Sequence, residues 1–228
     1  MIVTKQIRHE MRELLLNPAI LSVILLPIIM SKFIGVAMSG AGVEFLLLSV
    51  WILFAQVMVG IMLTGPNLIE ERETKTMDAL LCTPLNFGNI IVAKCGTILC
   101  FSILSQIAVF VINRGFHMEL LYLLLPMLIG GIVFVEIGAI IGLMIGSSKT
   151  GSAVSATVMV LLFLIVSVYP SLPEWTYNLF VLLPSVEVVE IMSSLMDHGK
   201  MLVKESIFLI VWLILLTSTI TVIGKKRY

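Results

Sequence analysis

Long apolar runs and short charged segments alternate along the whole chain. An apolar run of roughly 20 residues is long enough to cross the hydrocarbon core of a bilayer as a helix. Six runs close to this length occur. We expect membrane-spanning helices at residues 19–38, 45–68, 95–112, 120–145, 153–169 and 207–223. The pattern therefore predicts an all-α membrane protein with six transmembrane helices, forming one membrane domain over residues 1–228.

The composition agrees with a lipid environment. The chain is 59% hydrophobic and only 12% charged, with a mean hydropathy of +1.13, whereas soluble domains carry about 25% charged residues. Acidic and basic residues are equal in number, so no nucleic-acid partner is indicated. The three cysteines show neither a disulfide framework nor metal-ligand spacing. We expect this chain to bind no metal and no cofactor.

Positive charges set the expected orientation, because Lys and Arg are enriched in cytoplasmic loops. With the N-terminus inside, ten of the 14 basic residues lie on the cytoplasmic side. The other four are Lys32, Arg114, Lys200 and Lys204. We therefore expect a multi-pass plasma-membrane protein with both termini in the cytoplasm. Lys32 falls inside the first predicted span, so either that span ends early or the lysine reaches the far interface.

Two segments outside the spans are also patterned. Residues 1–17 place apolar side chains on one helical face and charges largely on the other, which is typical of an amphipathic helix on the membrane surface. An orientation anchor and a partner contact both fit it. Residues 170–206 are too apolar for a free loop. We expect one or two short helices there, re-entrant or lying on the outer leaflet, the second between Pro184 and Gly199. A lid and an exit gate both fit this segment.

The densest charge lies between the second and third spans, where residues 70–81 read EERETKTMDALL. We expect one short cytoplasmic helix, with Glu71 placed four positions before Lys75 as a favourable ion pair. Thr83-Pro84 should end this helix. A minimal turn needs only a few residues, so a longer patterned segment suits docking to another protein. The candidate docking residues are Glu70, Glu71, Arg72, Glu73, Met77, Leu80 and Leu81.

An enzyme is one alternative function. Glu70-Glu71 followed by Lys75 nearly matches the Glu-Glu-x-x-x-Arg motif of CAAX-processing-type membrane proteases. Those proteases also need histidines on membrane helices, whereas the histidines here lie at loops or interfaces. They are His9, His117 and His198. We therefore expect no enzyme activity and no catalytic residue in this chain.

A second alternative is a transporter that needs no ATP. Glu136 is the only carboxylate inside a predicted span, and an intramembrane acid is a functional candidate. Gln56 and Gln106 are the other large polar groups near mid-span, and hydrogen bonds between helices are their plain interpretation. The third class is a permease driven by a separate ATPase. No Gly-x-x-x-x-Gly-Lys-Ser/Thr motif occurs, so this chain does not bind ATP through a P-loop.

Residues 70–85, followed by Ile-Ile-Val-Ala-Lys at residues 90–94, resemble the signature of type 2 ATP-binding-cassette (ABC) exporter permeases. In that family an acidic-Arg-Glu start leads through Thr to Leu-Leu-x-Thr-Pro, and a Lys opens the third span. Leu-Leu-Asn-Pro at residues 15–18, and residues 183–190, resemble two weaker family features, so the resemblance covers essentially the whole chain. The family often has Gly at the position of Lys75. Because lysine is the better helix former, we expect a continuous helix there.

The resemblance implies a mechanism. Residues 70–81 would be the coupling helix, seated in a cleft of an ABC ATPase subunit, with ATP and Mg²⁺ bound by that partner. Two ATPase copies and two permease halves, as a homodimer or a heterodimer, would form the exporter in the bilayer. Rocking of the halves would move a hydrophobic or amphipathic cargo outward, such as a peptide, toxin or drug. On this hypothesis Glu71, Arg72, Glu73 and Met77 contact the ATPase and have no internal role.

Overall fold

The computed structural model describes residues 10–12, 14–38, 44–82, 86–173 and 180–227, except for the side chains of residues 44, 80, 81 and 227. In this part of the chain six helices are long and apolar enough to cross a membrane. They are α2 (Pro18–Ala37), α3 (Glu44–Glu73), α5 (Phe87–Arg114), α6 (Glu119–Met144), α7 (Ser148–Val168) and α10 (Val203–Arg227). The prediction of an all-α, multi-pass membrane protein with six spans is confirmed.

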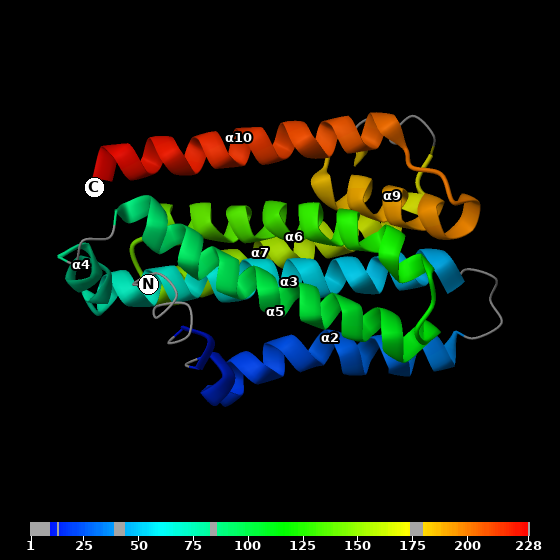
Figure 1. The fold of residues 1–228 in the computed structure, drawn as a ribbon, viewed down its shortest axis with the longest axis horizontal. Coiled ribbons are helices and arrows are strands. Elements are labelled where there is room, and N and C mark those ends of the chain that lie inside the picture. The colour runs from blue at the N-terminus through cyan, green and yellow to red at the C-terminus, as the bar shows by residue number, and fades with distance from the viewer. Residues whose placement is uncertain (1–9, 13, 39–43, 83–85, 174–179, 228) are drawn as a thin grey trace.

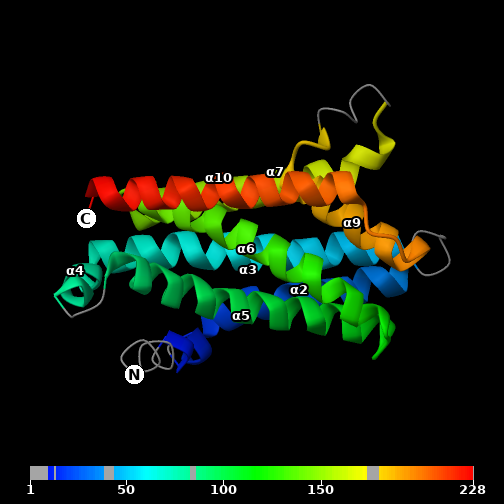
Figure 2. The same ribbon diagram turned by 45° about the horizontal axis from the view of Figure 1, so that its top comes forward.

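The long helices lie side by side as one bundle (Figure 1). A short helix, α4 (Thr76–Leu81), caps one end of the bundle, which we call the α4 end. Another, α9 (Pro184–His198), lies at the opposite end, the α9 end, and a 3-10 turn, η1 (Tyr169–Ser171), follows α7. Helices α3 and α6 are largely buried, whereas α2 and α10 are mostly exposed. Figure 2 shows α10 and α2 on opposite sides of this central pair.

Helices α3 and α6 form the most extensive contact of the bundle, and glycines of the two helices face each other there. A Cβ atom added to Gly138 would lie 2.9 Å from the backbone oxygen of Gly60, and one added to Gly142 would lie 2.9 Å from that of Gly65. Small residues let membrane helices approach backbone to backbone, where van der Waals packing and weak hydrogen bonds accumulate. The glycines of α6 therefore fix its position against α3.

Replacing Gly138 by alanine is expected to lower the free energy of unfolding by about 1–3 kcal/mol, because the added methyl group meets backbone atoms. A methyl group added to Gly96, on α5, meets nothing within 4 Å. The matched variant Gly96→Ala should be neutral or slightly stabilising through helix propensity. Thermal unfolding of both variants in one detergent measures the difference. Equal melting temperatures would contradict the close α3–α6 contact.

Several helix limits differ from the expected ones. The second span was expected to end at residue 68, but α3 continues through Pro66 to Glu73. Leu68 and Ile69 are almost fully buried, and this packing keeps the helix intact beyond the proline. Helix α5 begins at Phe87 rather than at residue 95. The apolar runs therefore located all six spans. They underestimated the lengths of α3, α5, α7 and α10, whereas α2 and α6 match the expected limits to within one residue.

Helix α9 confirms the helix expected between Pro184 and Gly199. Pro184 stands in its first turn, and Gly199 ends it in the left-handed conformation at φ 62°, where glycine carries no Cβ penalty. The helix contacts α3, α6, α7 and α10, and much of its surface is buried. It is therefore packed into the α9 end of the bundle. Residues 174–179 of this segment lie outside the described part of the chain.

The expected surface helix at residues 1–17 lies mostly outside the described residues and stays a prediction. Residues 10–12 and 14–16 are helical. Leu14 is buried, whereas Met11 and Leu15 are exposed. Asn17 accepts a hydrogen bond from the backbone N–H of Ala19 and so caps the start of α2. A new helix therefore begins at this point.

Candidate functional site

The prediction of a single helix over residues 70–81 is wrong, because the helix is interrupted between α3 and α4. Lys75 stands at the break with φ 58°, in the left-handed region. The hydroxyl groups of Thr74 and Thr76 lie 3.1 Å apart and bond to backbone oxygens at the end of α3. The good helix propensity of lysine does not keep the helix continuous here, because the backbone of Lys75 adopts a conformation that favours glycine.

Replacing Lys75 by glycine is therefore expected to raise the free energy of unfolding by about 1 kcal/mol, because a non-glycine residue in this conformation is strained. Lys75 is exposed, so the loss of its side chain removes little packing. Lys75→Ala is the matched control and should not give the same gain. The measurement is the melting temperature of the three proteins in one detergent, and equal gains for glycine and alanine would count against backbone strain.

Glu71 does not pair with Lys75 as expected. Its carboxylate accepts a hydrogen bond from the ammonium group of Lys94 on α5. Lys94 also donates to Glu10, near the start of the described chain, with 2.5 Å between Nζ and Oε1. Lys94 is only 2% exposed. One buried cation therefore joins the end of α3 to α5 and to the segment ahead of α2.

Arg72 binds the end of α6. Its Nη1 lies 2.8 Å from the backbone oxygen of Gly142, 3.1 Å from that of Leu143 and 3.0 Å from that of Ile145. These oxygens belong to the last turn of α6 and to its C-cap residue Ile145, where the carbonyl groups have no partner within the helix. A guanidinium group at a helix C-terminus also complements the negative end of the helix dipole. Arg72 therefore serves as a side-chain cap for α6.

Glu73 binds the start of α7. Its Oε1 accepts a hydrogen bond from the backbone N–H of Ser148 at 3.0 Å, and its Oε2 accepts one from the hydroxyl group of the same serine. A carboxylate suits this place because the first N–H groups of a helix lack partners and carry partial positive charge. Three consecutive residues thus hold three different helices.

We call Glu71, Arg72 and Glu73 the tether residues. The hypothesis that they lack an internal role is wrong, because each one binds another helix. Met77, also expected to contact an ATPase, is fully buried and packs with apolar residues of α3, α5 and α6. The side chains of Leu80 and Leu81, like Thr83-Pro84, lie outside the described part of the chain. Besides the tether residue Glu73, the side chains exposed around α4 are Glu70, Thr74, Lys75, Thr76, Asp78, Ala79 and Cys82.

The other expected polar site separates into two places. Gln56 Nε2 donates to Gln106 Oε1 at 2.9 Å, and both side chains are fully buried. Gln106 Nε2 in turn donates to the hydroxyl group of Ser102. This chain of hydrogen bonds joins α3 to α5, which is the plain interpretation of the two glutamines. Glu136 instead accepts a hydrogen bond from Thr217 of α10 at 2.5 Å, and the described residues include no hydrogen bond from it to either glutamine.

Two carboxyl groups of α9 lie among apolar residues at the α9 end. Glu187 is fully buried, and burial raises its pKa to about 8, with Glu205 adding to the rise and Lys204 opposing it. Burial and Glu205 also raise the pKa of Glu190. Glu187 is therefore mainly protonated at pH 7, which avoids the cost of a buried charge. The first turn of α9 consequently brings no net charge from Glu187 into the bundle.

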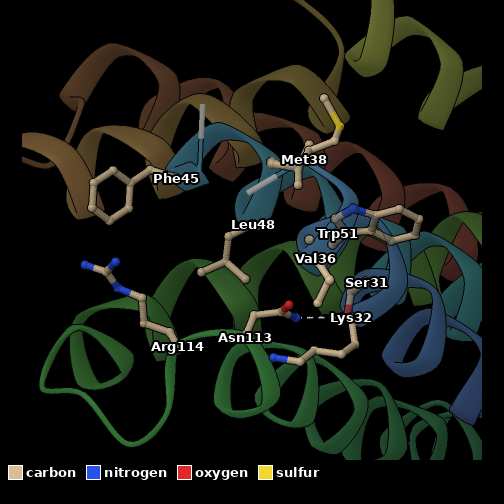
Figure 3. Close-up of a pocket in the computed structure, with 11 residues that line it drawn as sticks. Ser31, Lys32, Val36, Met38, Phe45, Leu48, Trp51, Asn113 and Arg114 are labelled. Atoms are coloured by element: carbon tan, nitrogen blue, oxygen red, sulfur yellow. Dashed lines mark hydrogen bonds between the residues drawn. The ribbon is translucent and has the colours of Figure 1, made fainter. Parts of the chain in front are cut away.

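A cavity of about 300 Å³ lies at the α9 end between α2, α3 and α5 (Figure 3). Figure 3 shows the apolar side chains of Phe45, Leu48 and Trp51 above the polar ones, and Val36 between Asn113 and Ser31. The polar lining residues are Ser31, Lys32, Asn113 and Arg114. Lys32 donates to the backbone oxygen of Ile112 at 3.1 Å. Helix α2 continues beyond it to Ala37. The first span therefore does not end at the lysine, whose head group reaches the end of α5.

From the sequence we did not identify Glu10, Ser148 and Thr217 as parts of these sites, and Lys94 was named only within the family signature. The sequence did offer a clue to Lys94, because this lysine lies at the edge of an apolar run and a buried lysine needs a partner. Ser147-Ser148, just before the fifth apolar run, gave another, because serine is a preferred helix N-cap. No protein-family model matches the chain, and no curated protein matches it.

Proposed function

We propose that this chain is the permease subunit of an ATP-driven exporter, as its motifs imply. The observation that carries the proposal is the position of α4, which projects from one end of the bundle with exposed side chains. Immediately before it, the tether residues bind α5, α6 and α7. A solvated turn between two spans would need neither the projection nor three attachments.

The attachments give a route for force. A partner that moves α4 also moves the last turn of α3, because only the break at Lys75 separates them. That turn carries Glu71, Arg72 and Glu73, so the ends of α5, α6 and α7 follow it. Rigid-body motion of packed helices about an interface is a common way to open a path. The tether residues thus transmit movement, and the contact with the ATPase falls to the exposed residues of α4.

Charge supports a cytoplasmic position for the α4 end. Basic residues there include Lys75, Lys149, Lys225 and Lys226, whereas Lys32 and Arg114 mark the α9 end. Cytoplasmic loops are enriched in such residues. The exporter would place α9 at the outer side, where it caps the bundle. The exposed apolar faces of α2 and α10 would contact lipid and a second permease half, as a homodimer or a heterodimer.

The test is co-expression with an ABC ATPase encoded beside the chain, followed by purification in detergent and measurement of ATP hydrolysis. The variant Asp78→Lys with Ala79→Arg alters two exposed residues of α4. It should abolish co-purification while the melting temperature of the chain stays unchanged. The matched control is Asp197→Lys, an exposed residue at the α9 end. Uptake or efflux driven by a proton gradient without any ATPase would replace the proposal with a secondary transporter using Glu136.

A further inference from the structure

A second, larger cavity of about 600 Å³ lies between α5, α6 and α10, toward the α4 end. In both ribbon views α6 runs between α10 and α5, and these two helices make few contacts with each other (Figure 1, Figure 2). Gly88 and Gly96 of α5 widen the space, since a methyl group added to either meets nothing within 4 Å. Val92 on the same wall is 71% exposed. The cavity therefore opens at the lipid-facing surface of the bundle.

One acidic group interrupts the largely apolar wall of this cavity. Glu136 lines it, and its Oε1 accepts the hydrogen bond from Thr217. Its Oε2 has no hydrogen-bond partner among the residues that the structure describes. Lys225 lines the cavity at the α4 end and forms no ion pair with Glu136 within the described chain. An acid in a membrane span that lacks a cationic partner is costly, and such residues mark ligand pathways.

We propose that this cavity binds lipophilic organic cations, which enter it from the surrounding lipid. The apolar part of such a ligand would rest on the walls supplied by Ile91, Leu99 and Ile220, and its positive centre would lie beside Glu136. The volume is in the range that holds drug-sized molecules. A bound cation would supply the positive partner that the carboxylate of Glu136 lacks. The inference rests on the proposed export function, whose cargo class it names.

The chemistry of the lining excludes other cargo. Besides Glu136 the polar lining residues are Asn86, Thr217, Thr221 and Lys225, together with the thiol of Cys95. A sugar would leave most of its hydroxyl groups without partners against this wall, which costs free energy for each one. A lipophilic anion would fit the apolar surface but would bring a like charge to the carboxylate. The sign of the charge therefore distinguishes the proposed ligand from other hydrophobic molecules.

Tetraphenylphosphonium and tetraphenylborate test this, because they share size and shape and differ in the sign of their charge. The full chain is placed in phosphatidylcholine nanodiscs, and binding of radiolabelled tetraphenylphosphonium is measured at equilibrium. We expect saturable binding that Glu136→Gln weakens at least tenfold. Gly96→Leu, which fills the open space, should abolish it. Glu119→Gln, which removes a carboxylate from the other end of the same helix, should leave it unchanged.

Equal binding by wild type and Glu136→Gln would overturn the proposal, as would tetraphenylborate competing as well as the cation itself. Glu136→Gln keeps the size of the side chain, so its result stands even if Gly96→Leu folds poorly. The binding measurement needs no ATPase. A chain that binds the cation but never joins an ATPase would refute the export function alone, and an ATPase complex without cation binding would refute this site alone.

Discussion

Replacing Lys94 by methionine is expected to lower the free energy of unfolding by about 3–5 kcal/mol, the usual cost of removing one partner from a buried ion pair. Lys94 is 2% exposed and binds both Glu10 and Glu71. Methionine fills a similar volume but removes the hydrogen bonds and the positive charge that Lys94 supplies to both carboxylates. The melting temperature of the purified protein in detergent, compared with wild type, measures the loss.

The control for Lys94 removes the carboxylates together with the cation. The triple variant Lys94→Met, Glu10→Gln and Glu71→Gln should recover much of the lost stability, because a neutral cluster leaves no unpaired buried charge. Charge loss alone is tested by Lys149→Met, since Lys149 is exposed at the same end of the bundle. This variant should melt like wild type. A wild-type melting temperature for Lys94→Met would show that the ion pairs contribute little.

Replacing Arg72 by methionine is the second change with a large expected effect. It leaves the backbone oxygens of Gly142, Leu143 and Ile145 without their donor. Hydrogen bonds from a charged donor contribute about 1.5–3 kcal/mol each, though those sharing one donor atom are not additive. We expect a loss of about 2–3 kcal/mol in unfolding free energy. The measurement is again the melting temperature, with Arg72→Lys as a variant that keeps the charge and should lose less.

Arg72→Met also separates transmission of movement from docking. If Arg72 holds α6 and does not contact the ATPase, the variant should still co-purify with the ATPase and hydrolyse ATP, but should transport poorly. The Asp78→Lys, Ala79→Arg variant should lose the complex itself. If folded Arg72→Met protein no longer co-purified with the ATPase, Arg72 would contact the ATPase directly. This result would contradict its role as a tether.

The sequence predicted the spans well because each is a continuous apolar run, and lipid requires that pattern of any helix that crosses it. The helix ends were less predictable. Helix α3 passes through Pro66 because Leu68 and Ile69 are buried beyond it, and the burial depends on α6 and α7 rather than on local sequence. The break at Lys75 was missed because helix propensity ranks lysine well and carries no information about a left-handed backbone.

The sequence also located the tether residues, but the prediction that they have no internal role was wrong for a similar reason. Charged side chains in a short segment suggest a solvated docking surface when their partners are not visible. Lys94 is 23 positions from Glu71, and Glu10 is 84 positions from Lys94. The partners of Arg72 are backbone oxygens, and no sequence pattern predicts such partners. The position of Glu136 inside an apolar run predicted an acidic group within a span, but only the packing of α5, α6 and α10 shows the cavity beside it.

The most direct test of the account is photo-cross-linking from α4 in native membranes. A photoreactive maleimide is attached at Ala79→Cys, in a chain whose own cysteines Cys82, Cys95 and Cys100 are replaced by serine, and adducts are identified by mass spectrometry. A matched probe at Asp197→Cys reports on the α9 end. We predict that the Ala79 probe captures an ABC ATPase and that the Asp197 probe does not. Adducts from Ala79 that contain only lipid, or capture of the ATPase from both positions equally, would contradict the account.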